Sequence, residues 1–283
     1  MTTLRFAVIG DPIAHSRSPR MHRAAFAALG LPHTYDALRV SAGELEQVIA
    51  ELRARTYAGL NVTIPYKQAV LSYVDEISPS ARAVGAANTL VCSPSGIVVA
   101  HNTDAPALAE ELRLLAGPAT PWSASTTLVL GSGGAALAAV AAFTELGVGE
   151  IAVRARSFES AERREAFLRA AKVPLTLQPW IASAASEKST RAVVQATSAG
   201  MAGAGPGESV SSIVDWSSLA PDAVALDVVY SPRDTPFLGA ARARGLRCTG
   251  GLGMLARQGA LAFEVWLHRS APFETMLAAI EQA

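Results

Sequence analysis

The sequence is poor in the residue types that would indicate a disulfide-rich, nucleic-acid-binding or metal-binding protein. It has two cysteines in 283 residues, Cys92 and Cys248, so we expect no disulfide framework and no thiolate metal site. Lys plus Arg and Asp plus Glu number 24 each, which gives no basic surface for nucleic acid or an anionic membrane. The five histidines lack the helical spacing that would pair two ligands, so no metal site is expected.

Long apolar runs are also missing. The most apolar region, residues 128–143, is interrupted by glycines and is too short to cross a bilayer. The first residues enter a strand-like run at once, without the pattern of a signal peptide. We therefore expect no membrane association and a cytoplasmic location. Apolar residues are nevertheless plentiful, because 50% of the chain is hydrophobic and 17% is charged, which is enough for two domains with separate cores.

Short apolar runs alternate with helical patterns along the chain, which predicts an α/β protein. A segment rich in Ala, Pro and Ser, residues 116–125, is the clearest linker, and a new strand-helix pattern starts after it. The expected strands cover residues 4–10, 35–40, 59–63, 84–92, 97–100, 127–130, 150–154, 191–196, 223–229 and 246–248. The expected helices include residues 19–29, 42–55, 65–74, 104–115 and 136–146.

Three polar side chains follow the buried strand expected over residues 59–63. Asn61, Thr63 and Lys67 lie at a strand-to-helix corner, with Pro65 near the first position of the expected helix. Open α/β sheets bind their ligands at the carboxyl ends of the strands. An amide, a hydroxyl and an ammonium group at this edge suit a small, oxygen-rich, anionic molecule.

Two other helix starts allow both a structural and a functional interpretation. Ser18 is placed to cap a helix that begins at Pro19, and Ser16 precedes it. Equally, two hydroxyls at a helix N-terminus can bind a carboxylate, which the helix dipole favours. Asp104 is expected to cap the helix over residues 104–115. In the alternative interpretation, its carboxylate contacts a ligand.

A glycine-rich turn opens the second half of the chain. Residues 131–135 connect an expected strand to an Ala-rich helix, as in phosphate-binding βαβ units, where glycines let the backbone approach a pyrophosphate. The next strand ends with Arg154 and Arg156, and no acidic residue comes before Glu159. Because an acid there would bind a ribose hydroxyl and an arginine a 2′-phosphate, the pattern favours NADP(H). The arginines are surface residues in the alternative interpretation.

Taken together, the motifs resemble those of the shikimate dehydrogenase family over nearly the whole chain. The matching segments follow one another in family order and with family-like spacing. They are residues 12–19 with His22, residues 61–67, 85–89, 102–104, 131–135, 196–198 with Gly200 and Met201, and 251–255 with Gln258.

The resemblance implies an α/β fold of two domains. An N-terminal substrate domain with a mainly parallel sheet would cover residues 1–104, completed by helices over residues 252–283. A Rossmann-like NADP-binding domain would cover residues 105–251. The implied activity is the reversible NADPH-dependent reduction of 3-dehydroshikimate to shikimate in the aromatic amino-acid pathway. Small molecules would be its partners, and the sequence leaves open whether it is a monomer or a homodimer.

The resemblance also implies roles for individual residues. Lys67 and Asp104 correspond to the family's catalytic pair, and Ser16 and Ser18 to the residues that bind the substrate carboxylate. The substrate-binding set is Ser16, Ser18, Asn61, Thr63, Lys67, Asn88, Asp104, Tyr230 and Gln258. The cofactor-binding set is Gly131, Ser132, Gly133, Gly134, Ala135, Arg154, Ala155, Arg156, Ser157, Thr197, Val228, Gly251 and Met254.

Departures from the family pattern concern mainly the 2′-phosphate. The family often has an arginine shortly after the glycine turn, where this chain has residues 136–138, and another where it has Ser160. An aspartate before the late glycines is replaced by Gly250. NADH use, oxidation of quinate and a ligand sensor without catalysis are therefore the alternatives. Retention of both Lys67 and Asp104 argues against the sensor.

Overall fold

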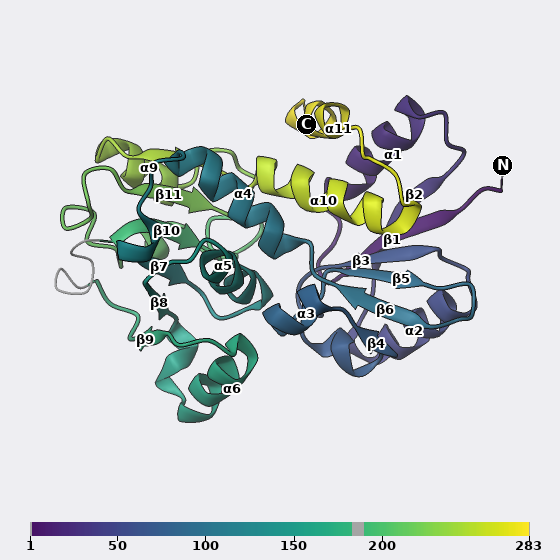
Figure 1. Ribbon diagram of the computed structural model, residues 1–283, viewed down its shortest axis with the longest axis horizontal. Coiled ribbons are helices and arrows are strands. Elements are labelled where there is room, and N and C mark those ends of the chain that lie inside the picture. The colour runs from purple at the N-terminus through teal and green to yellow at the C-terminus, as the bar shows by residue number, and fades with distance from the viewer. Residues whose placement is uncertain (1, 183–189, 283) are drawn as a thin grey trace. The chain divides into compact units, whose positions relative to one another are not determined.

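The computed structural model describes residues 2–182 and 190–282 and divides into two compact α/β units (Figure 1). Unit 1 comprises residues 1–107 and 255–283, and unit 2 comprises residues 108–254. The chain passes from one unit to the other within two helices, α4 (Asp104–Ala116) and α10 (Leu252–Leu267). Within the described ranges, no helix is long and apolar enough to span a membrane.

Unit 1 contains a six-stranded sheet in the order β2-β1-β3-β5-β6-β4. The pairings of β1 with β2 and β3, and of β4 with β6, are parallel, whereas β5 is antiparallel to both of its neighbours. Its strands are β1 (Arg5–Gly10), β2 (Thr34–Arg39), β3 (Gly59–Val62), β4 (Glu76–Ile77), β5 (Thr89–Cys92) and β6 (Val98–His101). Its other helices are α1 (Ser18–Ala28), α2 (Leu45–Arg53), α3 (Pro79–Val84) and α11 (Phe273–Glu281), with single turns at Ala42–Glu44 and Ala69–Ser72.

The two faces of this sheet are covered by different kinds of side chain. Ala7 and Ile9 of β1 pack in one apolar cluster with the buried side of α2, including Ile49 and Leu52. Phe6 belongs to the opposite face, as the strand period of two requires, and its ring lies 4.9 Å from that of Trp266 in α10. The aromatic face also includes Phe26, Phe263, Tyr35 and His22.

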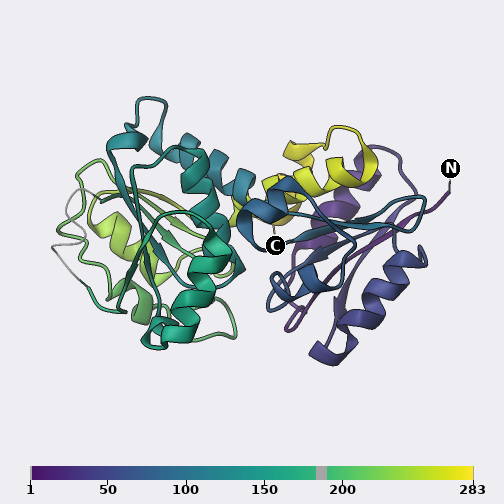
Figure 2. The same cartoon turned by 60° about the horizontal axis from the view of Figure 1, so that its bottom comes forward.

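Unit 2 contains a second six-stranded sheet, in the order β12-β11-β10-β7-β8-β9, and all its pairings are parallel. Its strands are β7 (Thr126–Leu130), β8 (Glu150–Arg154), β9 (Thr176–Gln178), β10 (Thr190–Gln195), β11 (Val224–Asp227) and β12 (Arg247–Thr249). Its helices are α5 (Gly134–Glu145), α6 (Ala161–Ala171), α8 (Glu208–Ser211) and α9 (Pro236–Ala243), with single turns at Trp122–Ala124 and Arg156–Glu159. Because strand order reverses at β7, right-handed crossovers put α5 and α6 on one face and α9 on the other (Figure 2).

Two predictions of secondary structure, one helix and one strand, are wrong. The helix expected over residues 65–74 is a turn followed by one 3₁₀ turn, Ala69–Ser72, because the Lys67 carbonyl accepts from the Ala87 amide (2.7 Å) instead of continuing a helix. The long strand expected over residues 84–92 begins only at Thr89. The preceding helix α3 starts where Ser78 Oγ accepts from the Ala81 amide and ends at Gly85, whose φ is +68°.

We predict that Gly59→Ala destabilises unit 1. A Cβ on Gly59 would overlap the indole of Trp266, which is held in place because its Nε1 donates to the Leu90 carbonyl (2.9 Å). Such overpacking costs about 1–3 kcal/mol. Denaturant unfolding should show that loss for Gly59→Ala and not for the control Gly43→Ala, where the new methyl group would have no neighbour within 4 Å. Equal stability of the two variants would contradict the packing assignment.

Candidate active site

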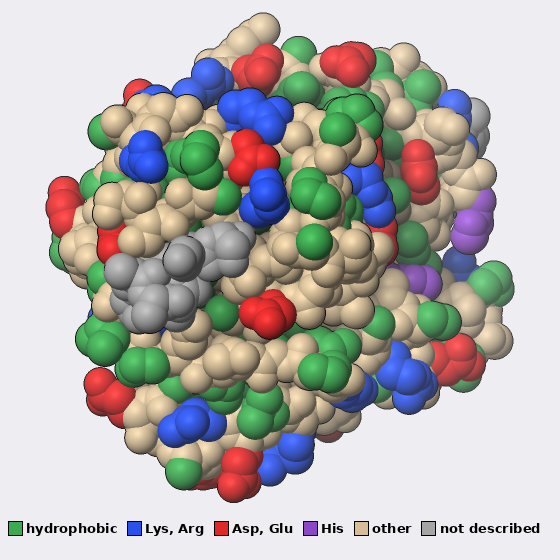
Figure 3. Space-filling model, turned by 60° about the vertical axis from the view of Figure 1, so that its left-hand side comes forward, with side chains coloured by type: hydrophobic (Ala, Val, Ile, Leu, Met, Phe, Trp, Pro, Cys, Tyr) green, Lys and Arg blue, Asp and Glu red, His purple; other side chains and the backbone are tan. Residues whose placement is uncertain are grey.

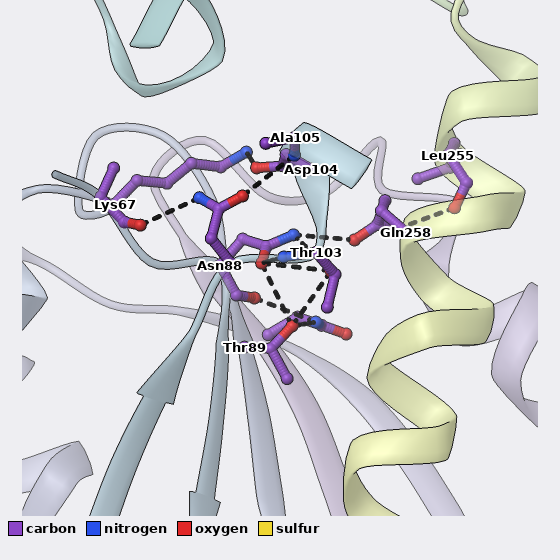
Figure 4. A network of polar contacts seen from close by, with 11 residues as sticks. Lys67, Asn88, Thr89, Thr103, Asp104, Ala105, Leu255 and Gln258 are labelled. Atoms are coloured by element: carbon purple, nitrogen blue, oxygen red, sulfur yellow. Dashed lines mark hydrogen bonds and ion pairs between the residues drawn. The ribbon is translucent and has the colours of Figure 1, made fainter. Parts of the chain in front are cut away.

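An ion pair stands at the carboxyl edge of the sheet in unit 1. Lys67 follows β3, Asp104 is the first residue of α4, and Lys67 Nζ lies 2.7 Å from Asp104 Oδ2 (Figure 4). The two side chains are 16% and 5% exposed, so the pair is largely desolvated. The ammonium group is the more accessible of the two charges. It can therefore meet an oxygen atom of a ligand while the carboxylate holds it from behind.

Asp104 does not cap α4, which corrects the sequence-based expectation. The Asn102 side chain does so instead, because its Oδ1 accepts from the Ala105 amide (3.0 Å) while its Nδ2 donates to the Ala86 carbonyl (2.9 Å). The Asp104 carboxylate is consequently available to Lys67. Ser18 is likewise not the cap of α1, since the helix already includes it and Ser16 Oγ accepts from the Ser18 amide (3.3 Å).

Asn88 is the centre of a buried polar network beside the ion pair (Figure 4). Its Nδ2 donates to Thr103 Oγ1 (2.9 Å) and Gln258 Oε1 (3.2 Å), and its Oδ1 accepts from the Thr103 amide (2.8 Å). Gln258 is in turn held by a bond from its Nε2 to the Leu255 carbonyl (2.8 Å). Asn88 and Gln258, 170 residues apart in the sequence, are thus fixed next to each other.

Asn61 of β3 lies next to Asn88 in the network and is 5% exposed. Its Nδ2 donates to the Asn88 carbonyl (3.0 Å) and to Thr89 Oγ1 (3.1 Å), and its Oδ1 accepts from the Tyr35 hydroxyl (2.6 Å). Its amide group is thus engaged by the protein on both sides, as that of Asn88 is, and Asn61 supports the network.

The structure places eight of the nine predicted substrate residues in unit 1, and Tyr230 in unit 2. Ser18 is buried, whereas Ser16 and Thr63 are partly exposed. The loop that precedes Ser16 lies against the end of β3, because the Asp11 amide donates to the Ile64 carbonyl (3.0 Å). The hydroxyl pair at the start of α1 and the corner that carries Thr63 therefore belong to the same edge of the sheet.

The glycine turn of unit 2 has the geometry of a phosphate cradle. Gly131 has φ +128°, and a Cβ there would lie 2.9 Å from the Ala196 carbonyl oxygen. Gly133 is the N-cap of α5 and has no side chain, so the first amide groups of the helix receive no side-chain cap from it. Ser132 Oγ lies 2.7 Å from Ser157 Oγ, which ties the glycine turn to the loop after β8.

The two arginines at the end of β8 have different environments. Arg154 is fully buried, and its guanidinium donates to the Ile213 carbonyl and to Gln178 Oε1 (2.7 Å). The expectation that it faces a 2′-phosphate is therefore corrected, since its charge is used inside unit 2. Arg156 is exposed, and its Cζ lies 5.9 Å from the ring centre of Trp180.

The remaining predicted cofactor residues also lie in unit 2. The Thr197 amide donates to Gln195 Oε1 (2.5 Å), so a buried glutamine fixes this turn. The Gly251 amide donates to the Val229 carbonyl (3.0 Å), and a Cβ on Gly251 would overlap the carbonyl of Val228. Ala135, Ala155 and Met254 complete the set, and the last two are buried.

Sequence reasoning assigned no role to Tyr35, His22 or Thr103. Tyr35 in β2 and His22 in α1 share one signal, which is a polar side chain at a position that the strand or helix period assigns to the core. Thr103 lies in the short loop between β6 and α4, where no such period applies. His22 is fully buried and stacks on Tyr35 with ring centres 4.3 Å apart and planes 6° apart. Neither ring nitrogen of His22 has a hydrogen-bond partner among the described residues.

On the face drawn in Figure 3, Lys and Arg side chains are interspersed with Asp and Glu, and neither sign gathers into a large patch. In the described part of the chain, no three His, Cys, Asp or Glu side chains are grouped as metal ligands.

Comparison with known proteins identifies the family. Residues 8–90 match the model of the shikimate dehydrogenase substrate binding domain, and residues 251–281 match that of the shikimate 5'-dehydrogenase C-terminal domain. The shikimate dehydrogenase (NADP(+)) of Methylobacterium radiotolerans is 40% identical over 94% of this chain and 92% of its own length. The chain belongs to the shikimate dehydrogenase family. This confirms the resemblance found in the sequence motifs. It also confirms that the chain is an oxidoreductase of an NADP-dependent family.

Solved structures agree with this assignment. Shikimate 5-dehydrogenase from Thermus thermophilus, in complex with NADP(H) and shikimate, has a TM-score of 0.82 and 36% identity, and the match covers 99% of both chains. The enzyme from Listeria monocytogenes, in complex with shikimate and NAD, has a TM-score of 0.84 and 30% identity, covering 98% of this chain and 96% of that one. The predicted α/β fold with a substrate domain and a Rossmann-like domain is confirmed.

We predict that His22 makes the folded protein sensitive to acid. Burial lowers the pKa of His22 to about 3, well below the ordinary value near 6.5. Above pH 6.5 the imidazole is neutral in both states and contributes nothing to the pH dependence. As the pH falls from 6.5 towards 3, only the unfolded chain takes up the proton, so stability is lost by up to about 1.4 kcal/mol per pH unit.

The measurement is the free energy of unfolding between pH 7 and pH 4.5 for the wild type and His22→Leu. The altered packing displaces the variant's curve by a constant amount, whereas its slope should be smaller than that of the wild type. His15→Leu, which removes an exposed histidine, is the control. Parallel curves for the wild type and His22→Leu would refute the assignment of a buried, neutral imidazole.

Proposed function

We propose that this chain catalyses the reversible NADPH-dependent reduction of 3-dehydroshikimate to shikimate. The observation that carries the proposal is the desolvated ion pair of Lys67 and Asp104, at 2.7 Å, in a member of the shikimate dehydrogenase family. A protein that only binds its ligand has no need of a proton donor held in this way. The same family membership favours a place in aromatic amino-acid biosynthesis, and the two separated cysteines favour the cytoplasm.

Lys67 is assigned to the oxygen of the ketone. NADPH, when bound, supplies the hydride, and the ketone oxygen becomes an alkoxide as the hydride arrives at carbon. The Lys67 ammonium group stabilises that charge and gives the oxygen a proton, and general acid catalysis of this kind contributes about 10²–10⁴-fold in rate. Asp104 accepts a hydrogen bond from Lys67 and keeps the ammonium group aimed at the reacting oxygen.

The other substrate residues are assigned by the groups that they offer. Ser16 and Ser18 bind the carboxylate at the start of α1, where the helix dipole favours an anion. Thr63, Asn88 and Gln258 address the ring hydroxyls, and Tyr230 is also assigned to the substrate. Asn88 and Gln258 are already linked at 3.2 Å, so both amides have fixed directions before any ligand is present.

The cofactor is assigned to unit 2. The glycine turn with Ser132 and the first turn of α5 fit a pyrophosphate, because a Cβ on Gly133 would have no neighbour within 4 Å and no side chain caps the helix there. Arg156 fits the 2′-phosphate of NADP(H), whereas Arg154 is occupied in the core. With one exposed guanidinium at this place we expect a preference for NADPH together with measurable use of NADH.

We predict that Lys67→Met keeps substrate binding and lowers kcat by two or more decades. Methionine preserves the length and the packing of the side chain but removes the proton and the charge. The measurement is loss of absorbance at 340 nm with NADPH and 3-dehydroshikimate, combined with calorimetry for binding. Arg53→Met is the matched control, because it removes an ion pair of the same unit, to Asp75 at 2.8 Å, away from the site. A wild-type rate for Lys67→Met would refute the assignment of Lys67 as the proton donor.

Arg156→Ala is predicted to lower kcat/KM for NADPH and to leave that for NADH unchanged. A hydrogen bond to a charged group is worth about 1.5–3 kcal/mol, so the loss should be roughly ten- to hundredfold. Arg169→Ala, which removes an exposed arginine of α6 paired with Glu165, is the control. If NADPH and NADH lose equally, Arg156 does not read the 2′-phosphate.

A further inference from the structure

We propose that Tyr35 is a positioning residue for the groups that bind the substrate ring hydroxyls, acting through Asn61 on Asn88. The inference rests on the proposed function, since it deepens the account of the same site. Tyr35 itself is fully buried in β2. Its hydroxyl donates to the side chain of Asn61 in β3.

The Tyr35 ring has little freedom to move. It stacks on His22 of α1 at 4.3 Å, and the indole of Trp266 lies 6.2 Å from it on the aromatic face of the sheet. The backbone of Tyr35 pairs with Phe6 in the parallel ladder of β1 and β2. A phenol held on these sides places its hydroxyl group at one point, so the hydroxyl can serve as a fixed reference for its partners.

The hydrogen-bond partner of the Tyr35 hydroxyl is Asn61. The Tyr35 hydroxyl donates to Asn61 Oδ1 at 2.6 Å, and this bond decides which way the amide faces. With its oxygen directed at Tyr35, Asn61 directs Nδ2 at the Asn88 carbonyl and at Thr89 Oγ1. Asn88, whose side chain reaches Thr103 and Gln258, is therefore anchored through its backbone by the orientation that Tyr35 imposes.

The Tyr35 hydroxyl keeps its proton for this bond. Burial raises the pKa of Tyr35 well above its ordinary value. The hydroxyl is therefore the donor, and Asn61 Oδ1 is its acceptor.

The chain contains a matched tyrosine that lacks these connections. Tyr66 is also buried in unit 1, and its hydroxyl donates to the Val40 carbonyl at 2.7 Å. Removing either hydroxyl deletes one buried hydrogen bond of similar length. Only the Tyr35 hydroxyl leads to side chains assigned to the substrate site, so the two Phe variants separate a positioning role from a purely structural one.

The experiment compares Tyr35→Phe and Tyr66→Phe with the wild type in shikimate oxidation by NADP⁺. We expect KM for shikimate to rise about tenfold in Tyr35→Phe, as loss of one buried hydrogen-bonding group implies, with kcat within about threefold and KM for NADP⁺ unchanged. Tyr66→Phe should keep all three constants, although both variants lose thermal stability. An unchanged KM for shikimate in Tyr35→Phe, or an equal rise in Tyr66→Phe, would overturn the proposal.

A double-mutant cycle with Asn61→Ala tests the route of the effect. If Tyr35 acts through Asn61, Tyr35→Phe should raise KM for shikimate much less in the Asn61→Ala background than in the wild type. Fully additive increases would overturn the proposed route. The wild type is assayed in the same series, and if it does not oxidise shikimate the proposed function fails, whereas turnover with an unchanged KM in Tyr35→Phe refutes the role of Tyr35 alone.

Discussion

The ion pair of Lys67 and Asp104 is the constraint on which the rest of unit 1 depends. Taking both charges out of water costs several kcal/mol per ion, which their attraction offsets only when the geometry is good. Two separate contacts supply that geometry. The Lys67 carbonyl accepts from the Ala87 amide, and Asn102 caps α4, which leaves the Asp104 carboxylate directed at Lys67 Nζ at 2.7 Å. The fold thus maintains a charge pair that adds little to stability, as expected of the catalytic pair proposed above.

The polar groups around the pair form a continuous network rather than a collection of independent contacts. In a low-dielectric interior, hydrogen bonds strengthen one another, and a buried group that loses its partner is costly. Asn88 connects β5 to α10 through Gln258, and Asn61 connects β3 to β5 through Thr89. The amides of Asn88 and Gln258 are therefore each oriented by another side chain. If they bind the substrate as proposed, the entropy cost of ordering them arises when unit 1 folds and not when the substrate binds.

The alternation of strands and helices, the corner at residues 61–67 and the glycine turn could be predicted from the sequence, because they follow from periodicity and from backbone requirements. It was insufficient where tertiary contacts decide. Asn102, not Asp104, caps α4, although both residue types cap equally well. Pro65 made the segment after β3 resemble the start of a helix, but the Lys67 carbonyl accepts a hydrogen bond from the amide of Ala87 instead. No local signal distinguishes these outcomes.

Arg154 shows the same limit for a charged residue and has a consequence for the cofactor. It ends a strand, where an arginine is expected to reach solvent, yet β8 is covered on both faces and the side chain turns inward to Gln178 and the Ile213 carbonyl. A guanidinium stays charged when buried, so it is satisfied by bonds that stabilise unit 2 and are lost to a ligand. In the proposed function, discrimination of the 2′-phosphate is therefore assigned to Arg156, whose guanidinium lies over the ring of Trp180. One such contact, at about 1.5–3 kcal/mol, would be enough for a preference but not for exclusion of NADH.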